Sequence, residues 1–292
     1  MKKSIIIVLF ALMLTVIPLT GCGFRDIDIE GEYITKEYTD LEGTSIDIHS
    51  IYVREGLSGV PVVVRFDGKS RIKSIKVKAC EGLFEYLDVK NKKDEIVISA
   101  GTRDTYNTEA VEIEINGFEF KAMDFEFCDA EIDLYSCNKF CNLNASAAST
   151  IRLSYFNGEE LHANINSASK LTINTMTATK FDLKLSAASK FNGVDIEMSD
   201  FIADLSAASS ATIYGGTGEL GLDCSSSSVF DAENLRCDKA NVRLSTASSA
   251  TISVSTTLGY DLSTGSYLIY VGSPEVIKDE VSTGSKVDKR LK

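Results

Sequence analysis

A short run of serines and alanines returns at a nearly fixed interval through the second half of the 292-residue chain. The serine that follows the two central residues of each corner, which we call the marker serine, recurs at spacings of 20, 20, 20, 19, 20, 18 and 19 residues. The marker serines are Ser149, Ser169, Ser189, Ser209, Ser228, Ser248, Ser266 and Ser285. A repeat of this period indicates a solenoid, in which each unit buries its apolar face against the next.

Apolar and polar residues alternate on both sides of each marker serine, as half-buried strands require. We expect inward positions at four, six and eight residues before the marker and at two and four residues after it. In the last unit these columns predict that Ile277 and Val281 point inward, whereas Asp279 breaks the pattern. The position four residues before the marker holds Ala145, Ile165, Leu185, Leu205, Cys224, Leu244, Leu262 and Val281.

A unit of this length has room for two short strands and a corner, but not for a strand, a helix and both loops. The repeat therefore predicts an all-β fold, a parallel β-helix of about eight to nine coils with ~20 residues per coil. Equivalent corner residues lie directly above one another at the strand spacing of about 4.8 Å, so small side chains are favoured there. The serine hydroxyls can also bond backbone groups that the bend leaves unpaired.

The row of serines has an alternative interpretation as a flat hydroxyl array that binds ice or carbohydrate. We disfavour it because ice-binding solenoids carry a regular Thr-x-Thr face. The positions after the corners here read TIR, KLT, KFN, SAT, VFD and SAT.

One outward column brings two carboxylates onto neighbouring coils. Asp204 and Asp223 could hold a Ca²⁺ ion, which prefers oxygen ligands. Lys184 and Arg243 flank them in the same column, and an outward ladder of ion pairs explains the pattern without an ion. We favour the ladder, and we expect no cofactor.

The residues before the repeats lack the period but are rich in strand signals, such as SIDIH at 45–49 and VEIEI at 111–115. We expect a tether over 22–40, an N-terminal β-rich cap over 41–120 that covers the open end of the solenoid, and β-helix repeats over 121–290. The stretch 125–134 resembles a first coil whose corner is one residue short. At the other end, a polar last coil with Asp279 and Lys289 argues against end-to-end stacking and predicts a monomeric head.

The first residues have the pattern of a targeting segment: two lysines, an apolar run over 5–19, and then Leu-Thr-Gly-Cys. This ending resembles the lipobox of bacterial lipoproteins. The resemblance implies a signal peptide over 1–21, cleavage before Cys22, and a thioether-linked lipid with a further acyl chain such as palmitate on that cysteine. The expected location is extracytoplasmic, with the protein anchored to the bacterial cell membrane.

Loss of residues 1–21 would remove two lysines and no acid, which moves the net charge from −12 to −14. Nucleic acid and anionic lipid headgroups are therefore unexpected partners for the folded part. With only two histidines, His49 and His162, chemistry based on histidine is also unexpected. We expect core or free thiols at the six other cysteines, with any disulfide pairing left open: Cys80, Cys128, Cys137, Cys141, Cys224 and Cys237.

An N-terminal strand segment, small-residue corners every twenty residues, and the closing segments GSYLIYVGSP (265–274) and VSTGSK (281–286) together resemble the head GIN domain family, a family of auto-transporter adhesins. The resemblance covers roughly residues 40–290 and implies a right-handed β-helix, a hand that parallel crossovers also favour. Family members usually carry SG(A/S)G at the corners, and this chain has SAAS in its middle coils. The family supplies no catalytic residues.

We therefore expect a cell-surface binding or adhesion module without catalytic activity, whose ligand is an extracellular polymer or protein. A structural or sensory envelope protein is the alternative. An enzyme acting on polysaccharides is a further alternative, because parallel β-helices host such chemistry. The coils differ in length by only two residues, which leaves no loop long enough to build a deep cleft.

Overall fold

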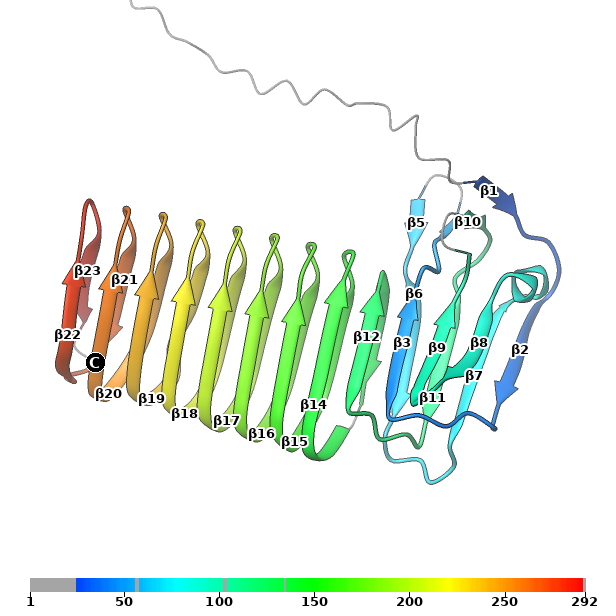
Figure 1. Ribbon diagram of the computed structural model, residues 1–292, viewed down its shortest axis with the longest axis horizontal. Helices are drawn as coiled ribbons and strands as arrows, with labels where there is room; N and C mark the ends of the chain where they lie inside the picture. The colour runs from blue at the N-terminus through cyan, green and yellow to red at the C-terminus, as the bar shows by residue number, and fades with distance from the viewer. Residues whose placement is uncertain (1–24, 56–57, 102–103, 134, 291–292) are drawn as a thin grey trace, which may run out of the picture.

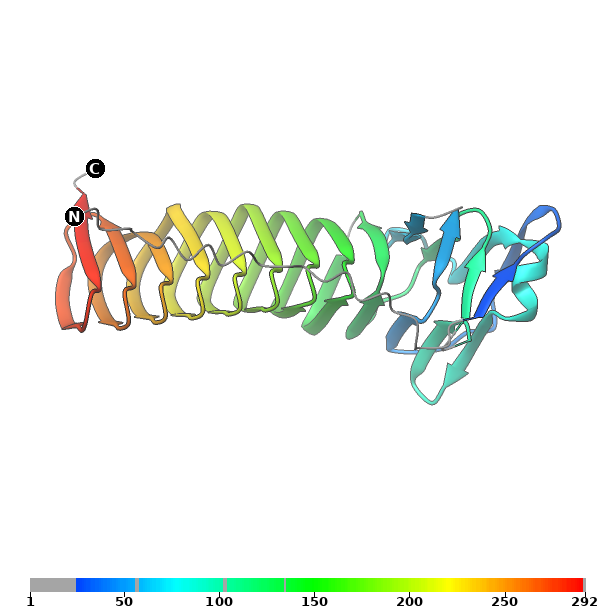
Figure 2. The same cartoon turned by 90° about the horizontal axis from the view of Figure 1, so that it is seen from above.

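The computed structural model shows a long right-handed β-solenoid of about eight turns with a cap of strands at its N-terminal end (Figure 1). The structure describes residues 25–55, 58–101, 104–133 and 135–290. Viewed from above, the coils follow one another along a single axis, with the cap at one end (Figure 2). The predicted parallel β-helix is confirmed.

Most coils consist of one long bent strand that begins after a marker serine and ends before the next turn. Each strand pairs in parallel and in register with its neighbours, so that Leu171 lies between Ile151 and Phe191. The long strands are β14 (Tyr135–Ser146), β15 (Thr150–Ile165), β16 (Lys170–Leu185), β17 (Lys190–Leu205), β18 (Ser210–Cys224), β19 (Val229–Leu244) and β20 (Ser249–Leu262). The last coils are made by β21 (Tyr267–Val271), β22 (Glu275–Val281) and β23 (Lys286–Arg290).

The solenoid has two broad faces that enclose the core. Sheet 1 contains the strand segments that lead into the turns, and it continues through β12 (Ala122–Glu126), β3 (Ser45–His49) and β9 (Glu95–Ser99). Sheet 2 contains the segments that follow the turns, and it continues through β13 (Cys128–Ile132), β6 (Val62–Asp67) and β11 (Glu112–Asn116). Parallel pairing thus runs through residues 45–132 as well as through the repeats.

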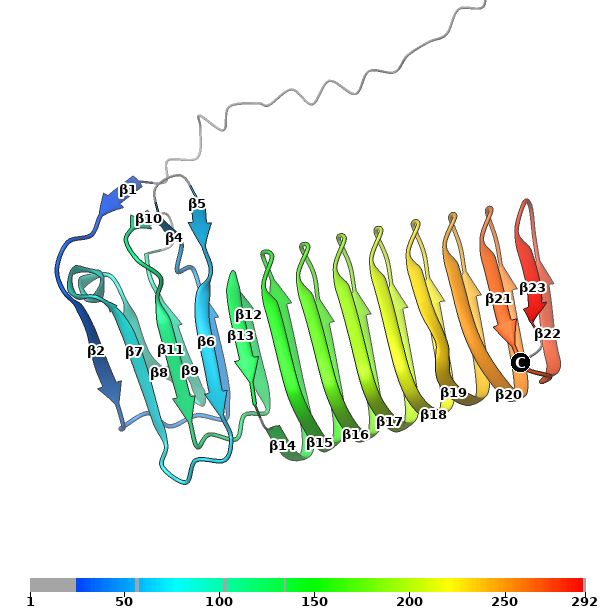
Figure 3. The same cartoon turned by 180° about the vertical axis from the view of Figure 1, so that it is seen from behind.

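The coils nearest the N-terminal end do not follow chain order. The coil built from β3 and β6 comes first in the chain, yet it lies between the coil of β9 and β11 and the coil of β12 and β13 (Figures 1 and 3). Between β12 and β13, Phe127 alone adopts a positive φ, of 55°. The predicted short corner is confirmed, but the stretch 125–134 is not part of the first coil, because the coils of β9 and β11 and of β3 and β6 precede it in the stack.

Antiparallel strands close this end of the stack. β8 (Asp88–Lys92) pairs with β9, β7 (Ser74–Cys80) pairs with β11, and β2 (Tyr33–Tyr38) pairs with β7. A 3₁₀ helix, η1 (Glu81–Glu85), follows β7. A separate sheet runs in the order β1 (Arg25–Asp28), β10 (Asp104–Asn107), β4 (Val53–Glu55) and β5 (Ser58–Val60).

The predicted inward columns form the core of the solenoid. Phe181 and Phe201 stack on adjacent coils with ring centroids 5.3 Å apart, and both are buried. The last coil departs from the prediction: Ile277 is 67% exposed and Val281 is 47% exposed. The register shifts in β22, which places Val276 instead of Ile277 opposite Leu258. Val281 keeps its register but is exposed because β20 is the only described strand that pairs with β22.

Each of the first seven turns consists of two residues in the left-handed region, followed by the marker serine, whereas in the last turn only Gly284 has a positive φ. In one turn Ala207 and Ala208 have φ of 51° and 61°, the signature of a type I′ turn. The Ser209 amide donates to the Ser206 carbonyl at 3.3 Å, and the Ala208 amide donates to Ser226 on the next coil at 2.9 Å. Stacking therefore favours small residues here, while the left-handed backbone conformation itself favours Gly and Asn over Ala.

The marker serines point into the molecule. The first seven are at most 1% exposed, and only Ser285 in the last coil is partly exposed. The hydroxyl of Ser209 donates to the Ser206 carbonyl at 2.7 Å, which closes its own turn. Between coils, the amide of Ser149 donates to the hydroxyl of Ser169 at 3.1 Å. Seven of the eight hydroxyls thus lie in the interior and do not form a surface array.

Replacing Ala207-Ala208 by Asn-Gly should stabilise the protein. Both residues have positive φ, which is strained for alanine, whereas Asn-Gly is the preferred type I′ pair. We expect the free energy of unfolding to rise by on the order of 1 kcal/mol in urea titrations followed by circular dichroism. As a control, Ala211→Gly in the adjacent buried strand should destabilise. A loss of stability with Asn-Gly would contradict this turn geometry.

Candidate binding site at the junction of cap and solenoid

The sequence-predicted site residues do not form one site. Cys22 and the predicted signal peptide over 1–21 lie outside the described residues. Asp204 and Asp223 are in-register neighbours on the outer side of sheet 1. Nη1 of Arg243 lies 3.4 Å from Oδ2 of Asp223, as the ion-pair ladder requires. Two carboxylates, one of them already paired, supply too few oxygens for Ca²⁺.

A polar hollow of about 490 Å³ opens on the outer side of sheet 1, where the cap strands meet the first coils. Its central row arises because four strands align equivalent outward positions, Asp47, Asp124, Asn144 and Asn164. The other residues around the hollow are His49, Phe125, Glu126, Ala145, Ser146 and Asn166.

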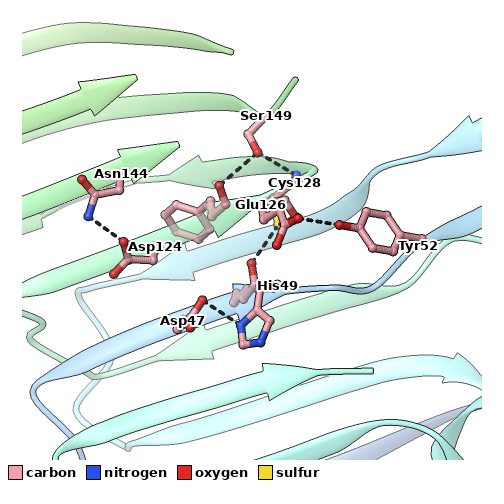
Figure 4. A network of polar contacts seen from close by, with 10 residues as sticks. Asp47, His49, Tyr52, Asp124, Glu126, Cys128, Asn144 and Ser149 are labelled. Atoms are coloured by element: carbon pink, nitrogen blue, oxygen red, sulfur yellow. Dashed lines mark hydrogen bonds and ion pairs between the residues drawn. The ribbon is translucent and has the colours of Figure 1, made fainter. Parts of the chain in front are cut away.

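Hydrogen bonds hold the polar side chains of the hollow in place (Figure 4). Nδ2 of Asn144 donates to Oδ1 of Asp124 at 2.5 Å, and the Tyr52 hydroxyl donates to Oε1 of Glu126 at 2.5 Å. Nδ1 of His49 lies 2.9 Å from Oδ1 of Asp47. The floor of the site is therefore preorganised before any ligand arrives.

Beneath the hollow, a cysteine stands where other coils have a marker serine. The Cys128 amide donates to the Ser149 hydroxyl at 3.0 Å, and its thiol contacts the Glu126 carbonyl at 3.3 Å. The thiol is fully buried, and burial raises the pKa of Cys128. This buried, protonated sulfur is suited to packing and not to nucleophilic attack.

The electrostatics of the hollow are dominated by carboxylates. Burial raises the pKa of Asp124, and the nearby carboxylates of Asp47 and Glu95 raise it further, against the opposing hydrogen bond from Asn144. Burial, with the hydrogen bond to Glu126, raises the pKa of Tyr52 to about 12. Tyr52 therefore acts as a hydrogen-bond donor and not as a base. The arrangement offers acceptors and amides to a ligand that carries hydroxyl or amine donors.

Sequence reasoning did not find this hollow. Asp47 and Asp124 are far apart in the chain and become neighbours only because the coil of β3 and β6 lies beside the coil of β12 and β13. The one available signal was their position in strands of alternating pattern, which many outward residues share.

Four cysteines agree with the expected free thiols: Cys80, Cys128, Cys224 and Cys237 are free and buried. Cys141 is also buried, and the side chain of Cys137 lies outside the described part. Burial raises the pKa of both Cys224 and Cys237 to about 12. Within the described part of the chain, no group of three or more His, Cys, Asp or Glu side chains could hold a metal ion. No helix found there is long and apolar enough to cross a membrane.

Asp124→Asn should stabilise the protein near pH 7. A carboxyl with a raised folded-state pKa disfavours folding once ionised, so its penalty is present above that pKa and vanishes as the pH falls below the unfolded value. Asparagine at this position removes the charge and can still accept a hydrogen bond from Asn144. We expect a gain of a few tenths to about 1 kcal/mol at pH 7, because the substitution removes the cost of burying the charge and the repulsion with Asp47.

The gain should disappear below about pH 4, where Asp124 is itself protonated. Thermal unfolding between pH 3 and pH 8 measures this difference. Asp195→Asn, which alters an exposed carboxylate on another coil, should show no such gain and serves as the control. A pH-independent effect of Asp124→Asn would rule out the electrostatic explanation.

Three solved structures share the fold. A protein from Parabacteroides merdae, described as a putative adhesin, is 12% identical with a TM-score of 0.66, over 91% of this chain and 99% of its own. A putative adhesin from Parabacteroides distasonis is 12% identical with a TM-score of 0.67, over 91% and 100%. A putative lipid binding protein from Parabacteroides distasonis is 14% identical with a TM-score of 0.60, over 91% and 100%. At this identity the similarity establishes the fold alone.

A search among curated proteins gave no match. The family model described as "putative auto-transporter adhesin, head GIN domain" matches residues 59–274, which include cap strands and almost all of the solenoid. A match over most of the chain, together with the shared β-solenoid, establishes the family. The chain belongs to the head GIN domain family.

Proposed function

We propose that this protein is a cell-surface adhesion module that binds an extracellular polymer through the outer faces of its solenoid, without catalytic activity. The observation that carries the proposal is the register of sheets 1 and 2, which repeats outward side chains about every 4.8 Å along a rigid axis. Extended concave or flat faces of this kind suit contacts with long, repetitive ligands. The family and the names of two structural neighbours support adhesion.

The polar hollow beside the cap is a discrete feature on the outer face of sheet 1. Its acceptors and amides, from Asp47, Asp124 and Asn164 among others, fit a partner rich in hydroxyl groups. Two potential nucleophiles beneath the hollow, the thiol of Cys128 and the hydroxyl of Ser149, are both buried. Their burial supports binding as the role of the hollow.

Lipid binding, the activity named for one structural neighbour, fits the interior less well. The columns of apolar side chains fill the space between the sheets, where the ring of Phe181 contacts those of both Phe191 and Phe201. An acyl chain would have to displace this packing. Any lipid contact would therefore be at the surface.

The anchor belongs to the same proposal. We infer from Leu-Thr-Gly-Cys, after an apolar run, that Cys22 carries a thioether-linked lipid and an acyl chain such as palmitate. The solenoid would then stand outside the cytoplasmic membrane, where an adhesion module can meet its ligand.

Full-length protein in mild detergent should bind at least one immobilised polymer from a panel of peptidoglycan, neutral and acidic polysaccharides, and extracellular matrix proteins. Saturable binding that is lost on thermal unfolding would support the proposal. If folded protein binds no member of the panel, the adhesion proposal fails and a structural or sensory envelope role becomes the better account.

A further inference from the structure

One region of sheet 2 differs in charge from the rest of this acidic chain, which has 42 acidic and 30 basic residues. Over four consecutive coils the three outward positions after each turn include no carboxylate. These positions, which we call the sheet 2 patch, are Thr150, Arg152, Ser154, Lys170, Thr172, Asn174, Lys190, Asn192, Val194, Ser210, Thr212 and Tyr214. Carboxylates return on both sides, with Asp129 and Glu131 on β13 and Asp231 and Glu233 on β19. The patch lies on the side of the solenoid that carries β6 and β13 (Figure 3).

Two exposed lysines at the centre of the patch stand directly beside each other. Lys170 and Lys190 are in-register partners on β16 and β17, and like charges paired in this way destabilise a sheet. No described carboxylate forms an ion pair with either ammonium group, whereas Arg152 pairs with Asp129. The fold gains nothing from this pair of charges, so a role in binding explains it better.

An exposed aromatic ring lies at the end of the same patch that is farthest from the turns. Tyr214 is 42% exposed and Val194, on the adjacent coil, is 50% exposed. The register between β17 and β18 shifts at this point, and bulges of this kind reorient side chains. The bulge depends on Gly215, which has φ of 138° and where a Cβ would lie 2.0 Å from the Ile196 carbonyl oxygen.

We infer that the sheet 2 patch is the contact surface for an acidic polysaccharide, an inference that rests on the proposed adhesion function. Lys170 and Lys190 contact carboxylate or sulfate groups of the polymer, and the ring of Tyr214 packs against a sugar face. The uncharged row of Thr172, Asn192 and Thr212 supplies hydrogen bonds to sugar hydroxyls.

Charge density favours this partner over nucleic acid or an anionic membrane. Duplex DNA carries one negative charge per about 1.7 Å of its axis, and its binding requires many basic contacts. The patch has only two unpaired lysines, and the surrounding surface is acidic. An acidic polysaccharide has far more widely spaced charges and many hydroxyl groups, which matches two lysines and a row of Thr and Asn.

The test measures binding of full-length protein in mild detergent to polygalacturonate, dextran, chitosan, duplex DNA and phosphatidylglycerol vesicles. Polygalacturonate should be preferred, with affinity that falls as salt rises. The variant Lys170→Gln/Lys190→Gln should weaken this binding by about tenfold or more. The control Lys184→Gln/Lys239→Gln removes the same charge from sheet 1 and should change the affinity for polygalacturonate by less than about threefold. Tyr214→Ser should also weaken binding.

Thermal stability provides a second readout. The Lys170→Gln/Lys190→Gln variant should be as stable as the original chain or more stable, since a like-charge pair has been removed. Loss of stability would assign the lysines a structural role and overturn the inference.

The outcomes separate this inference from the proposed function. If the polymer binds but the patch variant and the control variant weaken binding equally, the sheet 2 patch is not the contact surface. The adhesion proposal then still stands. Preference for DNA, vesicles or a neutral or cationic polymer would overturn the ligand class. If the folded protein binds nothing, both proposals fail.

Discussion

The fold depends on the way each coil reverses direction in two residues. Type I′ turns with two positive φ angles bring sheet 1 into sheet 2, and in six of the turns the buried marker serine also donates a hydrogen bond from its own hydroxyl across the turn. Because the next coil stacks directly on this turn, the serine also fixes coil register. The inward columns, and with them the outward rows that a ligand could contact, follow from that register.

A parallel stack needs a different solution at each end, since exposed strand edges invite association. At the N-terminal end, β2, β7 and β8 run antiparallel and cover the parallel strands. Cys128 takes the place of the marker serine in the third coil from this end, the coil of β12 and β13, and Phe127 makes a one-residue turn there. In the last coil, Asp279 and Lys289 occupy positions that are apolar or small in the other coils, and both side chains are exposed. Charges at this end oppose further stacking.

The repeating part of the structure could be predicted from sequence because every coil repeats the same alternation of inward and outward residues around its marker serine. The columns that include Phe181, Leu205 and Val242 are buried as the alternation indicates. The non-repeating parts depend on contacts that no period reveals. Sequence alone gave no means to place the coil of β3 and β6 beside β12, so the hollow around Asp124 was missed. Ile277 was misplaced because a register shift in β22 breaks the spacing that the columns assume.

The most direct test of the turn mechanism is Ser209→Ala, with Ser210→Ala on the outer surface as the matched control. Removing the Ser209 hydroxyl leaves the partly buried Ser206 carbonyl without one of its two donors. The free energy of unfolding in urea should fall by about 1 kcal/mol or more for Ser209→Ala, but by less than about 0.5 kcal/mol for Ser210→Ala. Equal stabilities for the two variants would contradict the claim that the buried serines hold the turns.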